Sequence, residues 1–133
     1  MAKGREIHDA RMAELSRFGK DLARRAKSKC ELCEGAGEKL SIFEVPPVPT
    51  QPDSDRCLLL CQRCSTAANE VRQKMTGEQW RFLSEASWSE IPMVQVMAVR
   101  MLKRLASHQD WAREALEGLF LDEEMETLVT ESA

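Results

Sequence analysis

The chain has 133 residues, of which 31% are charged and 43% hydrophobic, as in a soluble globular protein with room for one compact unit, in one or two parts. No apolar run approaches the roughly 18 residues that span a bilayer, which excludes a membrane protein. Charged residues begin at Lys3 and no apolar segment follows them, so nothing resembles a secretory signal, and we expect a cytoplasmic protein.

The net charge of −3 at pH 7 hides an uneven distribution. Residues 1–29 hold nine Lys and Arg against four Asp and Glu, whereas residues 110–133 hold one Arg against eight acids. The two ends can attract each other, the basic end can bind an anion such as nucleic acid, or both can be solvated helix faces. The candidate anion-binding residues are Arg17, Lys20, Arg24, Arg25, Lys27 and Lys29.

Apolar residues recur at helical spacing from Glu6 to about Lys27, with Arg, Lys and Asp between them. This pattern predicts one amphipathic, basic helix within residues 1–29 that runs into the first cysteine. Between residues 30 and 64 the runs LSIFEV and CLLLC flank the loop PPVPTQPDSD, which predicts two strands joined by a long, proline-stiffened loop. Ser65 is a candidate N-cap for a helix that continues to about Lys74.

Four cysteines form two C-x2-C pairs, Cys30 with Cys33 and Cys61 with Cys64, separated by 27 residues. Two such turns supply the four thiolates of a tetrahedral structural Zn²⁺ site, with Zn–S distances of about 2.3 Å. Four thiolates leave no position for water, so we expect the ion to organise residues 30–75 rather than to catalyse a reaction. A redox couple, disulfides and an iron–sulfur centre are the alternatives; the first lacks a βαβ context and the second lacks a signal peptide.

The fifth cysteine, Cys57, begins the second strand and is expected to be a buried free thiol, or an exchange partner of Cys61. His8 and His108 are far from the cysteines in sequence and are expected to be surface or packing residues. Four cations flank the cysteines and are expected to offset the negative cluster; they are Lys27, Lys29, Arg56 and Arg63.

The remaining residues, 76–133, predict a small helical bundle. TGEQ at 76–79 has the form of a capping box, and Pro92 is tolerated in the first turn of a long apolar helix from about Ile91 to Ser107. The cations Arg100, Lys103 and Arg104 near its end suit the helix dipole. Asp110 and Asp122 are candidate caps of two further helices, and the breadth of the long apolar stripe also permits a homodimer interface. The predicted fold class is therefore α+β, mostly α.

The order of C-x2-C turn, hairpin and C-x2-C turn at a helix start resembles a treble clef, as in the HNH nucleases. Those enzymes carry a histidine on the first strand where LSIFEVPP has Glu44, so their catalytic residues do not carry over. The runs KCELC, LSIFEVPPVP, CLLLCQRC and DWAREALEGLFLDEE resemble the proteobacterial form of the PhnA family over residues 28 to 124. The resemblance implies a zinc-binding N-terminal module with these four cysteines as ligands, followed by a helical region.

Three functions are compatible with this sequence. The first is a non-catalytic zinc module coupled to a helical bundle that binds a protein or nucleic acid. The second is an enzyme, either a degenerate HNH-like nuclease or an enzyme of phosphonate metabolism, for which Glu44, Asp53 and Asp55 are the best available acids. The third is a redox or zinc-sensing switch that uses Cys57.

Overall fold

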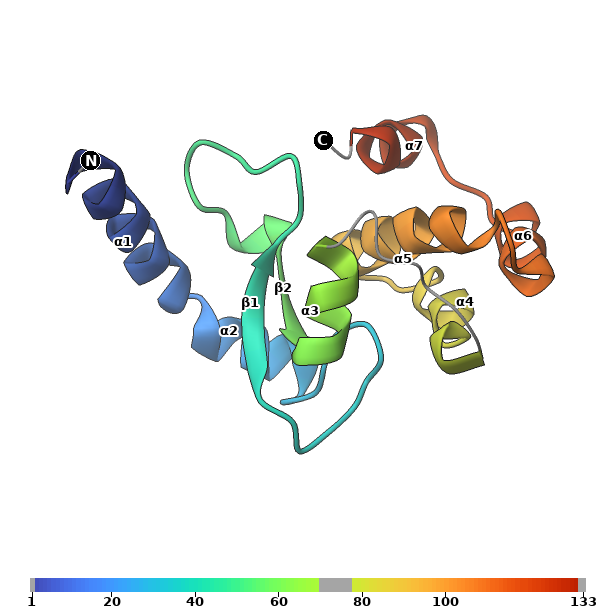
Figure 1. Cartoon of the computed structure of the whole chain (residues 1–133), viewed down its shortest axis with the longest axis horizontal. Coiled ribbons are helices and arrows are strands. Elements are labelled where there is room, and N and C mark those ends of the chain that lie inside the picture. The colour runs from blue at the N-terminus through green and yellow to red at the C-terminus, as the bar shows by residue number, and fades with distance from the viewer. Residues whose placement is uncertain (1, 70–77, 132–133) are drawn as a thin grey trace.

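The protein has an α+β fold that is mostly helical, as predicted, with one antiparallel hairpin (Figure 1). The computed structural model describes residues 2–69 and 78–131. Two helices, α1 (Ala2–Ser16) and α2 (Gly19–Ala26), precede the strands β1 (Leu40–Glu44) and β2 (Cys57–Cys61). A short 3-10 helix, η1 (Ser54–Arg56), lies directly before β2. After β2 come α3 (Gln62–Asn69), η2 (Glu78–Trp80), α4 (Leu83–Ala86), α5 (Pro92–Leu105), α6 (Asp110–Glu117) and α7 (Glu123–Thr130).

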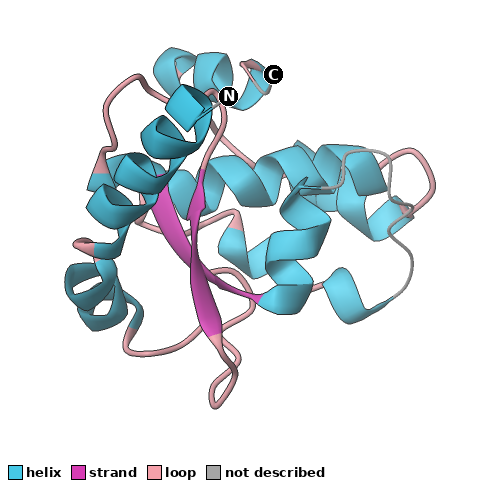
Figure 2. Cartoon of the chain, turned by 60° about the vertical axis from the view of Figure 1, so that its left-hand side comes forward, coloured by secondary structure: helices cyan, strands magenta, loops and turns pink. Residues whose placement is uncertain are grey.

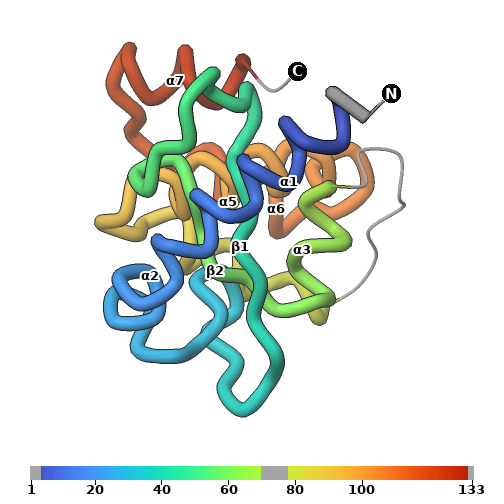
Figure 3. The backbone as a smooth tube through the Cα atoms, turned by 90° about the vertical axis from the view of Figure 1, so that its left-hand side faces the viewer, coloured from blue at the N-terminus to red at the C-terminus, as the bar shows by residue number. Residues whose placement is uncertain are grey.

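The hairpin pairs the two runs that the sequence predicts as strands, with Leu40 opposite Cys61 and Glu44 opposite Cys57. All five residues of β2 are buried, because each face of this strand is covered by a different part of the chain. Successive side chains of a strand point to opposite faces. Leu58 and Leu60 accordingly enter the main core, whereas Cys57 and Leu59 enter a second, smaller cluster. Figure 3 shows α1 and α2 in front of the hairpin and α5 behind it.

The main core is continuous from the hairpin to the C-terminal helices. Among the residues that the structure describes, it contains 23 buried ones, of which ten lie between Cys30 and Ala68 and thirteen between Trp80 and Val129. The central helix α5 supplies most of the second group, and Met97, Met101 and Leu105 on it are completely or almost completely buried. The cysteine-rich stretch and the helical stretch therefore pack around one helix and share one core.

The N-terminal segment forms two helices, where the apolar spacing predicts one. The helix is interrupted between Ser16 and Gly19. Among its described side chains α1 buries only Leu15, whereas Ile7 is 68% exposed. Figure 2 shows both helices on one side of the hairpin. The basic character also belongs to only one of them. In α1 three Lys and Arg balance three acids, whereas residues 17–29 hold six Lys and Arg and one Asp.

Helix starts agree with the sequence in some places and differ in others. Pro92 occupies the first turn of α5, and Asp122 caps α7 by accepting a hydrogen bond of 2.8 Å from the Met125 amide. Ser65 is not an N-cap, because α3 begins three residues earlier at Gln62, and the N-cap of α6 is Gln109 rather than Asp110. The predicted helix end at Lys74 and the start of the TGEQ capping box lie outside the described residues.

Two arginines of α5 bind backbone carbonyls of neighbouring helices. Arg100 is 6% exposed and donates to the Leu128 and Val129 carbonyls of α7 at 2.6 and 3.2 Å. Arg104 donates to the Ala67 and Ala68 carbonyls of α3 at 2.8 and 3.3 Å. The Leu128 and Val129 carbonyls lie in the last turn of α7, where carbonyls lack partners inside their own helix, and the two arginines hold α3 and α7 against α5. Within the described residues, no helix is both long and apolar enough to cross a membrane.

Candidate metal centre

The first C-x2-C turn, called here the first knuckle (Cys30–Cys33), is held by backbone hydrogen bonds. The Cys30 amide donates to the Gly35 carbonyl at 3.1 Å, and the Glu34 amide donates to the Cys30 carbonyl at 2.8 Å. The Gly35 amide points at the Cys33 sulfur, 3.4 Å away. A Cβ at position 35 would lie 3.3 Å from that sulfur, which explains the glycine. These contacts turn both thiols of the knuckle toward the second pair.

The second knuckle (Cys61–Cys64) lies where β2 passes directly into α3. Cys61 is the last residue of the strand and Cys64 lies in the first turn of the helix, and both are buried. The strand end and the helix start together fix the separation of the two sulfur atoms. A ligand pair at such a junction also sets the angle between the strand and the helix.

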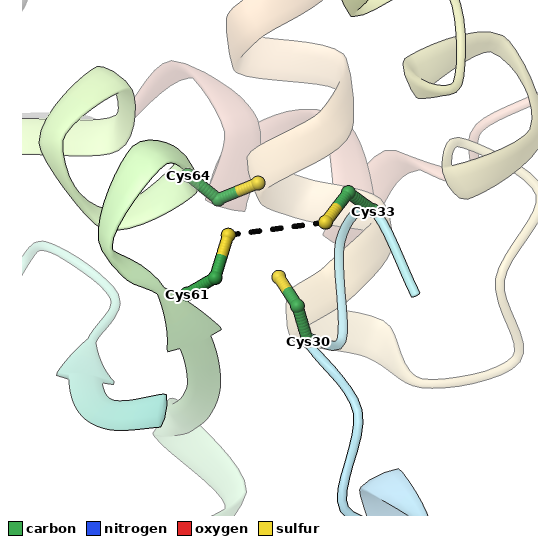
Figure 4. Close-up of side chains that lie close together, drawn as sticks. All are labelled: Cys30, Cys33, Cys61 and Cys64. Atoms are coloured by element: carbon green, nitrogen blue, oxygen red, sulfur yellow. Dashed lines mark hydrogen bonds between the residues drawn. The ribbon is translucent and has the colours of Figure 1, made fainter. Parts of the chain in front are cut away.

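The four sulfur atoms converge on one point between the knuckles (Figure 4). All four lie within 4.8 Å of one another, and the Cys33 and Cys61 sulfurs are 3.8 Å apart. A tetrahedron with Zn–S distances of about 2.3 Å has edges of about 3.8 Å, so this spacing suits a metal ion bound by all four. No disulfide joins these cysteines. The cluster of Cys30, Cys33, Cys61 and Cys64 can therefore hold a metal ion, as its spacing in the sequence predicts.

Electrostatics within the cluster also favour a bound cation. The pKa of Cys30 is lowered to about 4 because its sulfur accepts a hydrogen bond from the Cys64 thiol. The same hydrogen bond, together with burial, raises the pKa of Cys64, and burial raises the pKa of Cys61 to about 11. One thiolate thus opposes the ionisation of its neighbours. A divalent cation at the centre removes this conflict, since metal-bound thiols are deprotonated.

One of the four flanking cations lies directly beside the cluster. Arg63 is an exposed residue; a partial loss of solvation lowers the pKa of its guanidinium, but the nearby sulfurs of Cys64 and Cys33 outweigh this and raise the pKa above the ordinary value. It also lies over two aromatic rings, 5.4 Å from the Trp80 centroid and 5.7 Å from the Phe82 centroid. Arg63 therefore joins the second knuckle to the helical part through cation–π contacts.

The other three flanking cations have different positions. Lys27 and Lys29 are exposed and line a shallow hollow of about 280 Å³ together with Cys30. Arg56 precedes β2 at the end opposite Cys61, where it donates to the Val45 and Pro47 carbonyls at 3.3 and 3.1 Å. The expectation that Arg56 offsets the charge of the cysteines is therefore wrong, because the whole length of β2 lies between Arg56 and the second knuckle.

Glu31 is the residue of the site that sequence reasoning missed. It lies inside the first knuckle, its side chain is 1% exposed, and its carboxylate accepts two hydrogen bonds of 2.7 and 2.8 Å from the Arg25 guanidinium. The carboxylate also accepts from the Leu59 amide at 2.9 Å, and the Glu31 amide donates to the Leu59 carbonyl at 2.9 Å. A glutamate between two cysteines has no helical or strand periodicity, so nothing in the sequence signals its burial.

Cys57 lies apart from the four converging cysteines, at the far end of β2. As expected, it is a buried free thiol, and it donates to the Asp53 carbonyl at 3.3 Å. Burial raises its pKa to about 11, and the negative charges of Glu44 and Asp53 add to the shift. A thiol with this pKa is almost entirely protonated at neutral pH and is a poor nucleophile. This environment gives no support to a switch based on exchange with Cys61.

The three acids considered for catalysis do not form a cluster of free carboxylates. Glu44 binds Arg11 through two hydrogen bonds of 2.6 and 3.0 Å, and Arg11 also donates to the Pro49 and Thr50 carbonyls. Asp53 caps η1 by accepting from the Asp55 amide at 2.9 Å. These contacts tie α1 and the proline-rich loop to the hairpin. Both histidines, His8 and His108, are exposed side chains.

The six candidate anion-binding residues divide into five exposed cations and one that is already paired. Arg25 is committed to Glu31 and to the Cys57 carbonyl, 2.9 Å away. Arg24 approaches only Asp21, at 3.8 Å, and both side chains are about four-fifths exposed. The other four are exposed as well. The exposed set, called here the α2 surface, consists of Arg17, Lys20, Arg24, Lys27 and Lys29.

Comparison with known proteins gives no relative from which a family or function can be taken. No family model, curated protein or solved structure matches the chain.

Proposed function

We propose that the protein is a non-catalytic zinc module that binds nucleic acid through the α2 surface. The metal is proposed to be zinc because the site offers four cysteine sulfurs and no oxygen donor, a soft set at tetrahedral spacing. Membership of the PhnA family is a further proposal, supported by the order of knuckle, hairpin and knuckle in this chain. Five unbridged cysteines also suit the reducing cytoplasm.

The observation that carries this proposal is the concentration of exposed positive charge beside the first knuckle. Five exposed cations lie within residues 17–29, where the only acid is Asp21. Figure 1 places α2 and the acidic α6 on opposite sides of the hairpin and α5, so the two charged ends do not neutralise each other. A stripe in which exposed Lys and Arg outnumber carboxylates is suited to the phosphates of a nucleic-acid backbone.

The electrostatic model predicts how binding depends on salt. Each neutralised phosphate contributes about −0.9 to the slope of log K against log salt on duplex DNA, so five contacts give a slope of about −4 to −5. Affinity should then fall by roughly two orders of magnitude or more between 50 and 200 mM salt. Fluorescence anisotropy with labelled duplex DNA and single-stranded RNA, at four salt concentrations, measures this slope.

Charge reversal at single positions tests which surface is used. Lys20→Glu and Lys29→Glu should each weaken binding and reduce the salt slope by about one or more, since each removes a phosphate contact. Lys103→Glu is the matched control, because Lys103 is an exposed lysine of α5 that is not part of the α2 surface. Equal losses in all three variants would mean non-specific attraction, and no salt-dependent binding of the unmodified protein would overturn the proposal.

The identity of the metal needs a separate measurement. Protein purified without added metal should contain about one zinc ion per chain, measured by inductively coupled plasma mass spectrometry. Replacement of that ion by Co²⁺ should produce the absorption bands of tetrahedral thiolate coordination. Metal-free protein that remains fully folded, or iron as the bound element, would contradict the assignment.

A further inference from the structure

An ion pair with a buried carboxylate joins the α2 surface to the first knuckle. Arg25 lies in the last turn of α2, and Glu31 lies between the two cysteines of the knuckle. The contact is bidentate, and Arg25 donates in addition to the Cys57 carbonyl of β2. An arginine–carboxylate pair of this geometry restricts both distance and orientation. The position of α2 relative to the hairpin is therefore set largely at Glu31.

Glu31 is held in turn by the hairpin and by the knuckle. Its carboxylate accepts from the Leu59 amide and its own amide donates to the Leu59 carbonyl. Its chain neighbours Cys30 and Leu32 are buried in the main core. A metal ion bound by Cys30 and Cys33 fixes the backbone on either side of Glu31. Loss of the ion would release that backbone, and with it the acceptor of the Arg25 contact.

Other anchors of α2 are few. Leu22 is its only buried side chain, in the small cluster with Leu15, Cys57 and Leu59. The connection from α2 to Cys30 is a turn of three residues, in which Lys27 and Ser28 both have positive φ angles of 56° and 58°. Such a turn is specific in shape and holds α2 close to the metal site. The basic residues Lys27 and Lys29 lie in this turn and line one hollow with Cys30.

We propose that the Arg25–Glu31 pair couples the metal site to the α2 surface, so that nucleic-acid binding depends on the bound metal. This inference rests on the proposed function. Glu31 and Arg25 are positioning residues here, because they act on the placement of α2 and touch neither the metal nor the nucleic acid. Coupling between two binding sites is reciprocal, so nucleic acid must raise the metal affinity by the same factor by which metal raises the affinity for nucleic acid.

The variant Glu31→Gln separates coupling from simple electrostatics. Glutamine keeps an acceptor for the Leu59 amide but loses the ion pair with Arg25. The change makes the chain one unit more positive, so electrostatics alone would strengthen nucleic-acid binding. Coupling has the opposite effect: we expect metal affinity to fall about tenfold, the lower end of the effect of losing a direct partner of a metal ligand, because Glu31 bonds no cysteine sulfur and acts through the backbone between two of them. Because the pair is absent whether or not zinc is bound, nucleic-acid binding should be weaker than in the unmodified protein even with zinc in excess, and it should change less on zinc removal.

Glu34→Gln is the matched control. Glu34 is exposed, immediately follows Cys33, and its replacement changes the net charge by the same amount. This variant should keep the metal affinity of the unmodified protein within about threefold and bind nucleic acid as well or better. Arg25→Lys provides a second, milder variant, since it keeps the charge but loses the bidentate contact, and it should lower metal affinity less than Glu31→Gln.

Hydrogen exchange gives a readout that does not depend on nucleic acid. Zinc removal by a chelator should raise exchange in α2 as well as in the knuckles, and Glu31→Gln should raise exchange in α2 even in the zinc-loaded protein. Unchanged exchange in α2 on zinc removal would overturn the coupling, as would equal metal affinities of Glu31→Gln and Glu34→Gln. Coupled exchange without any nucleic-acid binding would instead leave the coupling in place and refute only the proposed function.

Discussion

Replacement of Leu60 by alanine measures how much the hairpin depends on the main core. Leu60 is fully buried on the face of β2 that enters this core. Loss of about three methylene equivalents removes about 2 kcal/mol of transfer free energy at about 0.8 kcal/mol each. A cavity in a core of 23 residues cannot collapse fully, which adds roughly 1 to 2 kcal/mol. We therefore expect Leu60→Ala to lower the free energy of unfolding by about 3 to 4 kcal/mol.

The neighbouring Leu59→Ala is the internal comparison. Leu59 is 7% exposed and belongs to the cluster of four buried residues under α1 and α2, which can close over a lost side chain. Its cost should be about 2 kcal/mol. With an m-value of about 2 kcal/mol/M, the urea midpoints of the zinc-saturated proteins should fall by about 1.5 to 2 M for Leu60→Ala and about 1 M for Leu59→Ala. A larger loss for Leu59→Ala would refute the assignment of the main core to the Leu60 face.

Three further predictions concern the thiol of Cys57, the metal and the N-terminal helix. Because the folded state holds the Cys57 proton with a pKa of about 11, against an ordinary value near 9, stability should be complete below pH 9 and fall as the pH rises toward 11. Urea titrations between pH 8 and 10.5 should therefore show a smaller loss of stability for Cys57→Ala than for the unmodified protein. An equal loss in both proteins would contradict this prediction. Chelation should abolish hydrogen-exchange protection in β2 but leave it in α5, because thirteen core residues belong to the later helices; uniform loss of protection would speak against this. Ile7→Asn should change the free energy of unfolding by less than about 0.5 kcal/mol, since Ile7 is 68% exposed. A loss above about 1 kcal/mol would mean that the Ile7 side chain packs against the rest of the protein.

The features that the sequence predicts well depend on local chemistry. C-x2-C spacing brings Cys30 and Cys33 together within one turn, and the same holds for Cys61 and Cys64. The β-prone runs become β1 and β2 with almost the predicted bounds. Pro92 and Asp122 mark helix starts because their preference for the first turn is a property of the residue itself. Each of these signals lies within a few residues of the structure that it specifies.

The differences arise where tertiary contacts decide. The apolar spacing of residues 6–27 continues through the break at Arg17 and Phe18, so periodicity alone gives no sign of two helices. The packing of Leu15 and Leu22 on β2 determines where the direction changes. Likewise, α3 begins at Gln62 because β2 ends directly at the second knuckle, which leaves Ser65 inside the helix.

The arginine contacts are the largest part that no sequence pattern revealed. Arg11 meets Glu44 across 33 residues, and Arg104 meets the Ala67 carbonyl of α3 across 37. The sequence explains Arg100 and Arg104 by the dipole of their own helix, whereas both bind carbonyls of other helices. A cation in a sequence carries no information about which distant acceptor it will reach, so such pairs become visible only with the fold.

The stacking of Arg63 on Trp80 equips the protein with its own optical probe of the metal site. Trp80 is 5% exposed, and its ring faces the guanidinium of Arg63, which lies between Cys61 and Cys64 in the second knuckle. Trp88 is 61% exposed. Indole emission shifts to longer wavelength when the ring meets water, so the colour of Trp80 emission would report the opening of the second knuckle without any attached dye. Replacing Trp88 and Trp111 by phenylalanine would leave this single signal, readable in real time during metal exchange.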